Sequence, residues 1–530
     1  MDGIKIVMAD NTRGSGLELL RREFGADAIE ARGKFDEAEL IEKIGSMDAL
    51  VVRSATTVTA KAIARAGKRL KVIGRAGVGT DNIDKQAATQ RGIVVMNTPF
   101  GNTVSAAEQA IALLFATARN LARADHLMQA RQWEKKTLVG SEVYGKVLGL
   151  VGLGRIGGHV AKVMQAAGMT AIAYDPHLSA DRAKQIGVEL TGSVDELLAR
   201  ADFVTIHTPL TDETRNLINA DRLAKMKKGA RLVNCARGGI VDEQALADAV
   251  GRGNLAAAGL DVFLKEPMTE GPLFGVKNIT LTPHLGASTE EAEERCGLQV
   301  AEQLVEFFRK QRIVNAVNVE YAAVSETMRP YVELARAMGK IGAVLLNAAP
   351  AEIEVAWSSR VGREDTGELV AAAAMGVIQN TGIEDVNLVN APTLARERGL
   401  LVKSSSSSAD TDVSCLDVRL AGGGKETRLA GTVYAGTRTP RIIRVDDAEM
   451  EVRLNKHLLF LRYPDEPGWV GKVGSLIARH GLNIDTLQVG ALKSRQRASM
   501  IIGMHEAAPE AMLGELRALP GLERAWLVNL

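Results

Sequence analysis

The chain has 530 residues, 46% of them hydrophobic, and its 65 basic residues are nearly balanced by 64 acidic ones. This length exceeds what a single hydrophobic core supports, so we expect three or four domains. A net charge of +1 excludes an electrostatic case for nucleic acid or an anionic membrane as the main partner. The sequence has no membrane-spanning apolar run, no signal-peptide pattern at its start and no paired-cysteine motif, which favours a cytoplasmic location.

Residues 1 to about 98 alternate short apolar runs with amphipathic stretches, which predicts a small parallel α/β unit. Arg53 and Ser54 directly follow one predicted strand, and Arg75 and Gly77 follow the next. Such folds bind ligands in the loops at the carboxyl ends of their strands. We therefore expect these residues to face the substrate, and two arginines that converge would suit a phosphate in addition to a carboxylate.

An alanine-rich stretch from residue 105 to about 132 predicts one long helix. The apolar run 147–151 then leads into three glycines, Gly152, Gly154 and Gly157. Strand, tight turn and helix in this order predict a dinucleotide site with the pyrophosphate at the helix N-terminus. Gly152 permits the sharp turn, Gly154 lets the backbone approach the phosphate, and Gly157 lets the helix pack closely on the strand.

Asp175 ends the next apolar run, 18 residues after Gly157. This spacing is close to the ~20 residues at which a carboxylate binds the ribose diol of the dinucleotide. Because a carboxylate repels a 2′-phosphate, we expect NAD rather than NADP as the cofactor. Apolar strands recur as far as about Pro283, so the sequence predicts a doubly wound sheet for this unit.

Three polar residues follow later strands of this unit, and their chemistry fits the oxidation of an alcohol. His284 stands between a strand and a helix, where an imidazole could move the hydroxyl proton. Glu266 could pair with the imidazole and raise its pKa, and Arg237 offers a planar fork to a substrate carboxylate. Taken singly, each residue also has a structural interpretation: a structural histidine, a surface acid, and a surface or helix-capping arginine.

The sequence from residue 290 onward predicts a helix and two further domains. After Glu290 an amphipathic helix runs to about Arg312, and we expect it to pack back on the first unit. Residues 316–452 mix a long helix with strands and contain five serines, 404–408, which we interpret as a solvated loop rather than an anion-binding nest. From residue 457 the predicted elements follow the βαββαβ order of a ferredoxin-like unit.

Arg237, Glu266 and His284 in this order, with the glycine turn and the segment Val-Arg-Ser-Ala-Thr at 52–56, resemble the D-isomer-specific 2-hydroxyacid dehydrogenases. The resemblance implies an α/β fold in which a doubly wound Rossmann domain is inserted in a smaller flavodoxin-like substrate domain. Tyr-Pro-Asp-Glu-Pro-Gly at 463–468, followed by Asn-Ile, is similar to an ACT domain. These features together look like the long form of the branch that acts on 3-phosphoglycerate, with an α+β intervening domain.

The resemblance implies roles for individual residues, and it implies no metal site. The residues expected to take part in catalysis are Arg237, Glu266 and His284. For the cofactor they are Gly152, Gly154, Arg155, Ile156, Gly157, Asp175, Thr208, Cys235, Arg237, Asp261, His284 and Gly286. For the substrate they are Arg53, Ser54, Arg75, Gly77, Arg237 and His284. For L-serine as an effector they are Tyr463, Asp465 and Asn483.

The resemblance also implies a domain order and a reaction. The boundaries are 1–98 with 290–315 for the substrate domain, 99–289 for the NAD-binding domain, 316–452 for the intervening domain and 455–530 for the ACT domain. The reaction is the NAD-dependent oxidation of 3-phospho-D-glycerate, the first step of L-serine biosynthesis, with L-serine as feedback effector. In this family the helix from residue 105 and the segment 133–136 join a dimer interface, and ACT units pair, so we expect a homodimer or homotetramer.

The sequence leaves other functions open. The same fold serves glyoxylate, D-lactate and erythronate-phosphate dehydrogenases, and an ACT tail argues against the first two. A protein of a different class, an NAD-sensing corepressor on a dehydrogenase scaffold, is disfavoured by the intact Arg-Glu-His set. The tail could also serve oligomerisation alone.

Overall fold

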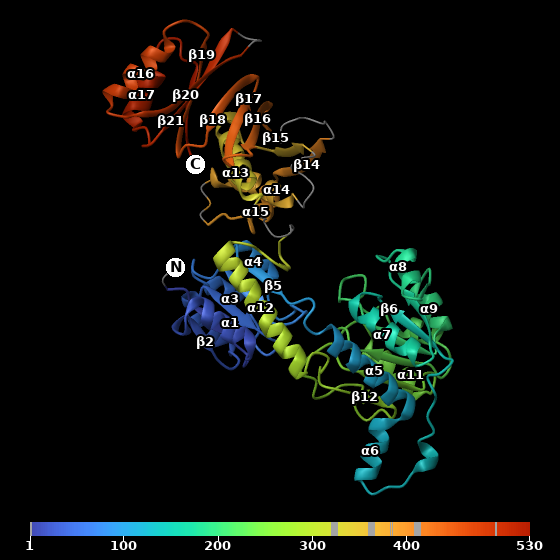
Figure 1. Cartoon of the computed structure of the whole chain (residues 1–530). Helices are drawn as coiled ribbons and strands as arrows, with labels where there is room; N and C mark the ends of the chain where they lie inside the picture. The colour runs from blue at the N-terminus through green and yellow to red at the C-terminus, as the bar shows by residue number, and fades with distance from the viewer. Residues whose placement is uncertain are drawn as a thin grey trace. The chain divides into compact units, whose positions relative to one another are not determined.

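A computed structural model of the chain describes residues 3–319, 327–358, 366–381, 383, 385–407, 415–492 and 496–530. The chain folds into two compact units (Figure 1). The first contains Met1–Thr12, Gly16–Asn97 and Val300–Leu530, and the second contains Arg13–Ser15 and Thr98–Gln299. Among the described residues we find no helix with the length and hydropathy needed to cross a bilayer.

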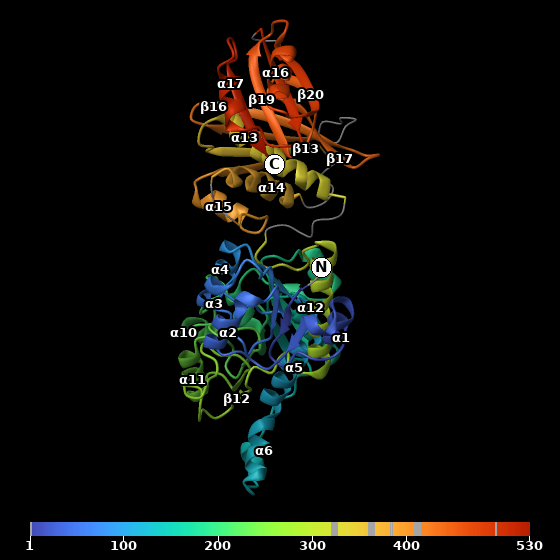
Figure 2. The same ribbon diagram turned by 90° about the vertical axis from the view of Figure 1, so that its left-hand side faces the viewer.

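The N-terminal part of the first unit is a five-stranded parallel sheet in the order β2-β1-β3-β4-β5, the flavodoxin-like order. Its strands are β1 (Ile6–Met8), β2 (Ile29–Ala31), β3 (Ala49–Val52), β4 (Val72–Arg75) and β5 (Val94–Asn97). One face is covered by α1 (Ser15–Phe24) and the second half of α12 (Glu290–Lys310), and the other by α2 (Glu37–Lys43), α3 (Ala60–Arg65) and α4 (Lys85–Gln90) (Figure 2). Because all strands run parallel, their carboxyl ends share one edge.

The second unit is a seven-stranded parallel sheet in the order β12-β11-β10-β9-β6-β7-β8, which is the Rossmann order. Its strands are β6 (Val147–Val151), β7 (Thr170–Tyr174), β8 (Glu189–Leu190), β9 (Phe203–Ile206), β10 (Arg231–Asn234), β11 (Ala257–Leu260) and β12 (Ile279–Leu281). Its helices include α7 (Arg155–Ala166), α8 (Ala180–Gln185), α9 (Val194–Arg200), α10 (Ala220–Lys225) and α11 (Glu243–Gly251). The expected doubly wound sheet is confirmed.

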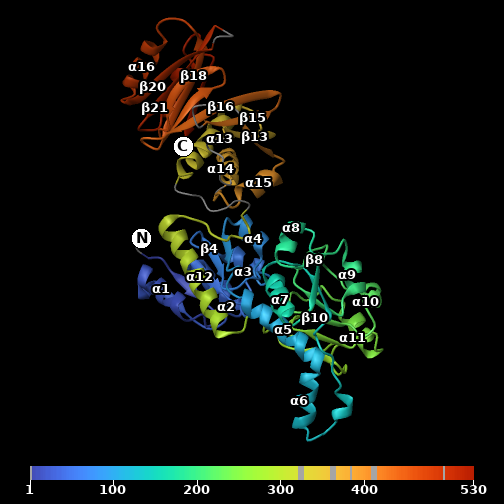
Figure 3. The same ribbon diagram turned by 45° about the vertical axis from the view of Figure 1, so that its right-hand side comes forward.

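The prediction of one helix over residues 105–132 is wrong. Two helices occupy this stretch, α5 (Thr103–Arg119) and α6 (Leu121–Gln129). Asn120 between them takes a left-handed backbone conformation, with φ of 52°, which interrupts the ladder of helical hydrogen bonds. Asparagine adopts this conformation at low cost, and hydrophobic periodicity does not reveal it. The segment that contains α6 extends away from the sheet of this unit (Figure 3).

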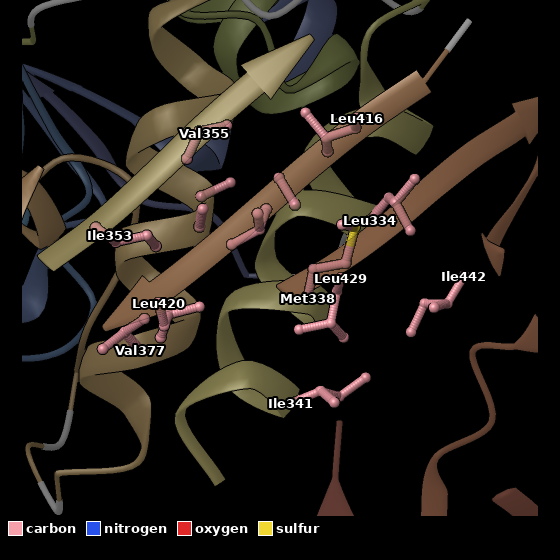
Figure 4. Packing of buried hydrophobic residues seen from close by; sticks show 14 of the residues in the cluster. Leu334, Met338, Ile341, Ile353, Val355, Val377, Leu416, Leu420, Leu429 and Ile442 are labelled. Carbon is pink, nitrogen blue, oxygen red and sulfur yellow. The ribbon is translucent and has the colours of Figure 1, made fainter. Parts of the chain in front are cut away.

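The middle of the chain forms a six-stranded sheet in the order β14-β13-β15-β16-β17-β18. Its strands are β13 (Glu352–Ser358), β14 (Leu401–Ser407), β15 (Cys415–Gly422), β16 (Lys425–Tyr434), β17 (Thr439–Val445) and β18 (Ala448–Arg453). Helices α13 (Arg329–Leu346), α14 (Gly367–Gln379) and α15 (Ala391–Glu397) accompany it. Figure 4 shows Leu334, Met338 and Ile341 of α13 packed against Leu429 and Ile442 of the sheet.

The interpretation of the serine run as a loop is wrong for most of its length. Residues 404–407 form the end of β14 and pair in parallel with residues 355–358 of β13. Ser408 lies outside the described residues. Composition favours solvation of serine, but backbone pairing with a neighbouring strand decides the conformation here.

The C-terminal sheet is antiparallel, in the order β20-β21-β19-β22, and its elements follow the predicted βαββαβ order. They are β19 (His457–Pro464), α16 (Trp469–Arg479), β20 (Ile484–Leu492), β21 (Arg497–Met504), α17 (Glu510–Arg517) and β22 (Arg524–Asn529). Both helices pack on one face of this sheet. Leu458, Phe460 and Ile501 on the other face belong to the same core as α13, so the middle and C-terminal sheets share one hydrophobic core.

Candidate active site

The glycine turn after β6 has the geometry that a dinucleotide phosphate requires. Gly152 has a left-handed φ of 93°, and a Cβ at Gly157 would lie only 2.4 Å from the carbonyl oxygen of Gly152. Helix α7 begins after Gly154, and no described side chain caps its first N–H groups. These donors and the positive end of the helix dipole are therefore available to an anion.

Asp175 and Thr208 lie beside the glycine turn. The Asp175 carboxylate accepts hydrogen bonds from the N–H groups of Leu153 and His177, at 2.9 and 3.0 Å. Thr208 Cγ2 would lie 2.9 Å from a Cβ at Gly152, and Thr208 Oγ1 is buried with no hydrogen-bond partner among the described residues. A buried hydroxyl without a hydrogen-bond partner is energetically unfavourable. A dinucleotide bound at the glycine turn would supply the partner that Thr208 Oγ1 lacks among the described residues.

His284 and Glu266 meet at the carboxyl edge of the same sheet. His284 Nδ1 lies 2.7 Å from Glu266 Oε2, and Glu266 Oε1 accepts a hydrogen bond from the Phe263 N–H at 3.0 Å. His284 has a left-handed φ of 55°, a conformation that is uncommon for a non-glycine residue and concentrates at functional sites. With Nδ1 engaged, Nε2 is the nitrogen that remains to exchange a proton with a substrate.

The pair shifts the two pKa values in opposite directions. The hydrogen bond to Glu266 raises the pKa of His284 above its ordinary value, against the effect of burial. Burial acts to raise the pKa of Glu266, but the hydrogen bonds from His284 and the Phe263 N–H outweigh it and lower that pKa. Glu266 is therefore ionised, orients the imidazole and stabilises its protonated form.

Arg237 lies within electrostatic reach of this pair. It follows β10 in a turn that Asn234 fixes by donating its Nδ2 to the Arg237 carbonyl oxygen at 2.9 Å. Burial and the hydrogen bond between Glu266 and His284 have the larger effects on the two pKa values. The charge of Arg237 has a smaller effect, which lowers the pKa of both groups. The structure thus gathers the guanidinium, the carboxylate and the imidazole at one edge of the second unit.

Asp261 holds the loop that carries His284. Its carboxylate is fully buried and accepts hydrogen bonds from the N–H groups of Leu285 and Gly286, both at 2.8 Å, and from Thr282 Oγ1 at 2.6 Å. The sequence resemblance placed Asp261 and Gly286 at the cofactor. The structure adds that the carboxylate fixes the backbone on either side of Leu285, directly before Gly286.

Two residues of this site were not predicted from the sequence. Gln109 of α5 donates its Nε2 to Thr282 Oγ1 at 3.1 Å and so supports the same loop. His207 lies behind the glycine turn, with its ring 3.0 Å from Thr205 Oγ1, and burial lowers its pKa to about 4. A lone amide on an alanine-rich helix is a signal for Gln109, whereas no sequence signal distinguishes His207 from other structural histidines.

The remaining expected cofactor residues, Arg155, Ile156 and Cys235, belong to the same unit as the glycine turn. Arg155 stacks on Phe100 with 4.0 Å between the guanidinium carbon and the ring centre, and donates to the Pro99 carbonyl oxygen at 3.0 Å. Ile156 packs against the core of the unit. Burial raises the pKa of the Cys235 thiol, which is therefore neutral. In the described part of the chain no group of three or more acidic, histidine or cysteine side chains could hold a metal ion.

Four of the expected substrate residues belong to the first unit: Arg53 and Ser54 follow β3, Arg75 is the last residue of the neighbouring strand β4, and Gly77 lies just after it. The other two, Arg237 and His284, belong to the second unit. Arg75 Nη1 folds back to donate to the carbonyl oxygen of Ala76 at 2.7 Å. A Cβ at Gly77 would lie 2.2 Å from this nitrogen, so glycine leaves the space that the guanidinium occupies. Arg53 and Ser54 stand at the same edge of the sheet, in the loop after β3.

Three family models match successive parts of the chain. They are the D-isomer specific 2-hydroxyacid dehydrogenase NAD binding domain at residues 111–286, the D-3-phosphoglycerate dehydrogenase intervening domain at residues 327–446 and the ACT domain at residues 457–521. The chain is 40% identical over 530 residues to the D-3-phosphoglycerate dehydrogenase of Synechocystis sp., which covers 99% of this chain and 95% of the relative. The chain belongs to the D-3-phosphoglycerate dehydrogenase family.

Further comparisons agree with this membership. The D-3-phosphoglycerate dehydrogenase of Mycobacterium leprae is 42% identical over 498 residues, 93% of this chain and 94% of the relative. The crystal structure of the TT0316 protein from Thermus thermophilus matches with a TM-score of 0.54 and 35% identity, over 59% of this chain and 100% of that one. This member of the family is an NAD-dependent oxidoreductase, and its expected Rossmann, intervening and ACT domains are confirmed.

The ACT domain does not bring its three expected effector residues together. Tyr463 lies near the end of β19 opposite Ala498 of β21, and Asp465 comes after Pro464, the last residue of β19. Asn483 precedes β20, whose first residue pairs with Met504 at the other end of β21. These two positions on β21 are about 20 Å apart along the strand. One copy of the domain therefore does not supply a common pocket for Tyr463, Asp465 and Asn483.

Proposed function

We propose that this chain oxidises 3-phospho-D-glycerate at C2 to 3-phosphohydroxypyruvate with NAD, the first step of L-serine biosynthesis. The observation that carries the proposal is the His284–Glu266 pair beside Arg237, in the unit that also holds the glycine turn. We assign residues 1–98 with 290–315 to substrate binding, 99–289 to NAD binding, 316–452 to the intervening domain and 455–530 to the ACT domain.

In this mechanism each side chain has one task. His284 Nε2 takes the proton of the C2 hydroxyl, and the Glu266 carboxylate stabilises the resulting imidazolium through Nδ1. Arg237 binds the substrate carboxylate through its planar fork. NAD, when bound at the glycine turn, supplies the acceptor for the hydride that leaves C2.

Further residues complete the cofactor and substrate assignments. We assign Gly152, Gly154, Gly157 and Arg155 to the pyrophosphate side, Asp175 to the ribose diol, and Ile156, Thr208, Cys235, Asp261 and Gly286 to the rest of the cofactor. We assign Arg53, Ser54, Arg75 and Gly77 to the substrate and its phosphate. Arginine suits a phosphate because the planar guanidinium forms two parallel hydrogen bonds.

The pH dependence of the reaction tests the role of Glu266. Oxidation needs neutral His284, so its rate rises as the pH passes the pKa of His284, which Glu266 raises. In Glu266→Gln that pKa falls, so the acid limb of the kcat/KM profile moves to lower pH, while the maximal rate drops roughly tenfold. Reduction of 3-phosphohydroxypyruvate needs protonated His284, so its alkaline limb moves in the same direction. An acid limb that stays in place contradicts the assignment.

Asp175 sets the preference for NAD. Asp175→Ala removes the ribose partner and the charge that repels a 2′-phosphate, so we expect KM for NAD to rise roughly tenfold and the kcat/KM ratio of NADP to NAD to rise with it. Asp181→Ala, which removes an exposed carboxylate from the first turn of α8, is the matched control and leaves both values unchanged. A variant at Asp175 that keeps the wild-type selectivity contradicts the ribose contact.

The substrate is tested by steady-state NADH formation with a panel of 2-hydroxy acids. The panel contains 3-phosphoglycerate, erythronate 4-phosphate, D-lactate and glycolate, the last as the reduced partner of glyoxylate. The proposal predicts the highest kcat/KM for 3-phosphoglycerate. A higher value for another acid assigns the chain to that substrate, and no turnover with any acid favours an NAD-sensing binding protein.

L-Serine is our proposed effector, held by two copies of the ACT domain. Because one copy separates Asp465 from Asn483, we propose that Tyr463 and Asp465 of one copy and Asn483 of another form each site. Calorimetric titration is expected to detect serine binding to wild type and not to Asp465→Ala or Asn483→Ala. Mixed assembly of the two variants restores one intact site per pair, and no recovery after mixing contradicts the shared site. No binding to wild type leaves oligomerisation as the function of the tail.

We also propose an oligomeric state and a cellular location for the chain. Leu121, Met128, Trp133 and Val139 in and after α6 are exposed apolar side chains, which supports a homodimer through this segment. Pairing of ACT domains would extend the dimer to a tetramer, and analytical ultracentrifugation of wild type and Trp133→Glu distinguishes these states. The three cysteines are free thiols, which supports a cytoplasmic location, and we propose neither nucleic acid nor membrane as a partner.

A further inference from the structure

The loop Arg53–Thr56 after β3 is held at both ends by two side chains from other loops. Asp10, which follows β1, accepts hydrogen bonds from the N–H groups of Arg53 and Thr56 at 2.7 and 3.1 Å. Asn82, in the segment after β4, donates its Nδ2 to the carbonyl oxygens of Arg53 and Thr56, both at 2.7 Å. The four backbone polar groups at the two ends of this loop thus all bond to Asp10 or Asn82.

Burial makes these bonds more than surface contacts. Asp10 is 7% exposed and Thr56 is fully buried. The second carboxylate oxygen of Asp10 accepts a hydrogen bond from Thr56 Oγ1 at 2.5 Å, and that hydroxyl in turn accepts one from the Phe35 N–H at 3.0 Å. Asp10 itself has a left-handed φ of 61°, a conformation that aspartate adopts more readily than most non-glycine residues. Removal of the carboxylate leaves buried donors without partners.

The Asp10 carboxylate bonds to a loop that we assign to an acidic substrate, although its negative charge repels an anion. The presence of this charge therefore needs an explanation. Three hydrogen bonds to Asp10 offset that charge, and what the carboxylate contributes in return is a fixed backbone. A loop that already has its bound conformation loses less entropy when it takes up a ligand. The charge of Asp10 is therefore compatible with substrate binding by the same loop.

We propose that Asp10 and Asn82 are positioning residues that fix the Arg53–Thr56 loop for the acidic substrate. This inference rests on the part of the proposed function that gives Arg53 and Ser54 to the substrate. Asp10 and Asn82 act through the loop and do not touch the reacting atoms. Their loss raises KM for the acid, leaves KM for NAD unchanged and lowers kcat little.

The chain offers a matched control at the opposite edge of the same sheet. Asp48, which precedes β3, also accepts a hydrogen bond from a backbone N–H, that of Lys5 at 2.8 Å, and it pairs with Arg69 at 2.6 Å. Asp48→Ala therefore removes a comparable carboxylate from the amino ends of the strands. If Asp10 served stability alone, Asp10→Ala and Asp48→Ala would both lower the melting temperature and neither would change KM for the acid.

The experiment compares Asp10→Ala, Asp10→Asn, Asn82→Ala and Asp48→Ala in the full-length chain. We expect KM for the acid to rise about tenfold or more in the two alanine variants of the loop supports, and less in Asp10→Asn, which keeps one acceptor oxygen. Hydrogen exchange of the peptide that contains residues 53–56 is expected to speed up in the same order. Asp48→Ala changes neither quantity.

Each outcome decides the proposal. The acid used is whichever member of the panel wild type oxidises best, so failure of 3-phosphoglycerate as substrate does not remove the test. If no acid is oxidised, hydrogen exchange decides alone, and if Asp10→Ala does not fold, Asp10→Asn and Asn82→Ala decide. Unchanged KM and unchanged exchange in the folded variants, or equal changes in Asp48→Ala, overturn the inference.

Discussion

His284→Asn is expected to reduce kcat for 3-phosphoglycerate oxidation by about 10³-fold while KM for NAD changes less than about threefold. The imidazole is the group placed to take the C2 hydroxyl proton, and general bases contribute typically 10²–10⁴-fold to a rate. Asparagine can hydrogen-bond to Glu266 but cannot accept a proton near neutral pH. Stopped-flow measurement of NADH formation in a single turnover separates this chemical step from product release.

The control for this prediction is His505→Asn, which removes an exposed imidazole from the C-terminal domain and leaves kcat unchanged. Glu266→Gln in the same assay is expected to be less damaging than His284→Asn, because the proton carrier remains. A His284→Asn enzyme with more than about a tenth of wild-type kcat would show that another group takes the proton.

Local sequence patterns predicted most of the fold because each strand had to bury its own apolar run. The strands that lead into the glycine turn and the loop of His284 were anticipated for this reason, as was the βαββαβ tail. Hydrophobic periodicity gave a wrong prediction where the backbone conformation of a single residue ended a helix. Asn120 splits the helix predicted over residues 105–132, because its left-handed conformation ends one helix and starts another.

Amino-acid composition predicted the wrong conformation for the serines at 404–407, and the physical reason differs from that at Asn120. The tendency of serine toward solvated loops is weak, and pairing with β13 overrides it in β14. Strand pairing is a long-range property that the local composition does not contain. The effector residues illustrate the same limit, since only the register of β19, β20 and β21 reveals that Asn483 lies far from Tyr463.

The candidate site could be predicted from the sequence only as far as chemistry restricts residue types. Arg237, Glu266 and His284 stood out because few side chains bind carboxylates or move protons, and each followed a strand. Asp10, Gln109 and His207 were missed, since their contacts join loops or helices that are distant in the sequence. Asp10 reaches Thr56 across 46 positions, and only the parallel order of β1 and β3 makes them neighbours.

Gly157→Ala is expected to weaken NAD binding about 100-fold and to lower the free energy of unfolding by about 1–3 kcal/mol. The added methyl would lie 2.4 Å from the carbonyl oxygen of Gly152. That oxygen belongs to the backbone of the turn and cannot rotate away, so the turn itself must open. NADH fluorescence titration and urea unfolding measure the two effects separately.

Two neighbouring glycines provide controls that distinguish packing from cofactor approach. A Cβ at Gly158 meets no described atom within 4 Å, so Gly158→Ala keeps NAD affinity and stabilises α7 by about 0.5–1 kcal/mol. A Cβ at Gly154 also meets none, so Gly154→Ala folds normally, but its methyl stands where the phosphate approaches the backbone and weakens NAD binding roughly tenfold. If Gly157→Ala binds NADH as tightly as Gly158→Ala does, close packing at this turn is not what the cofactor requires.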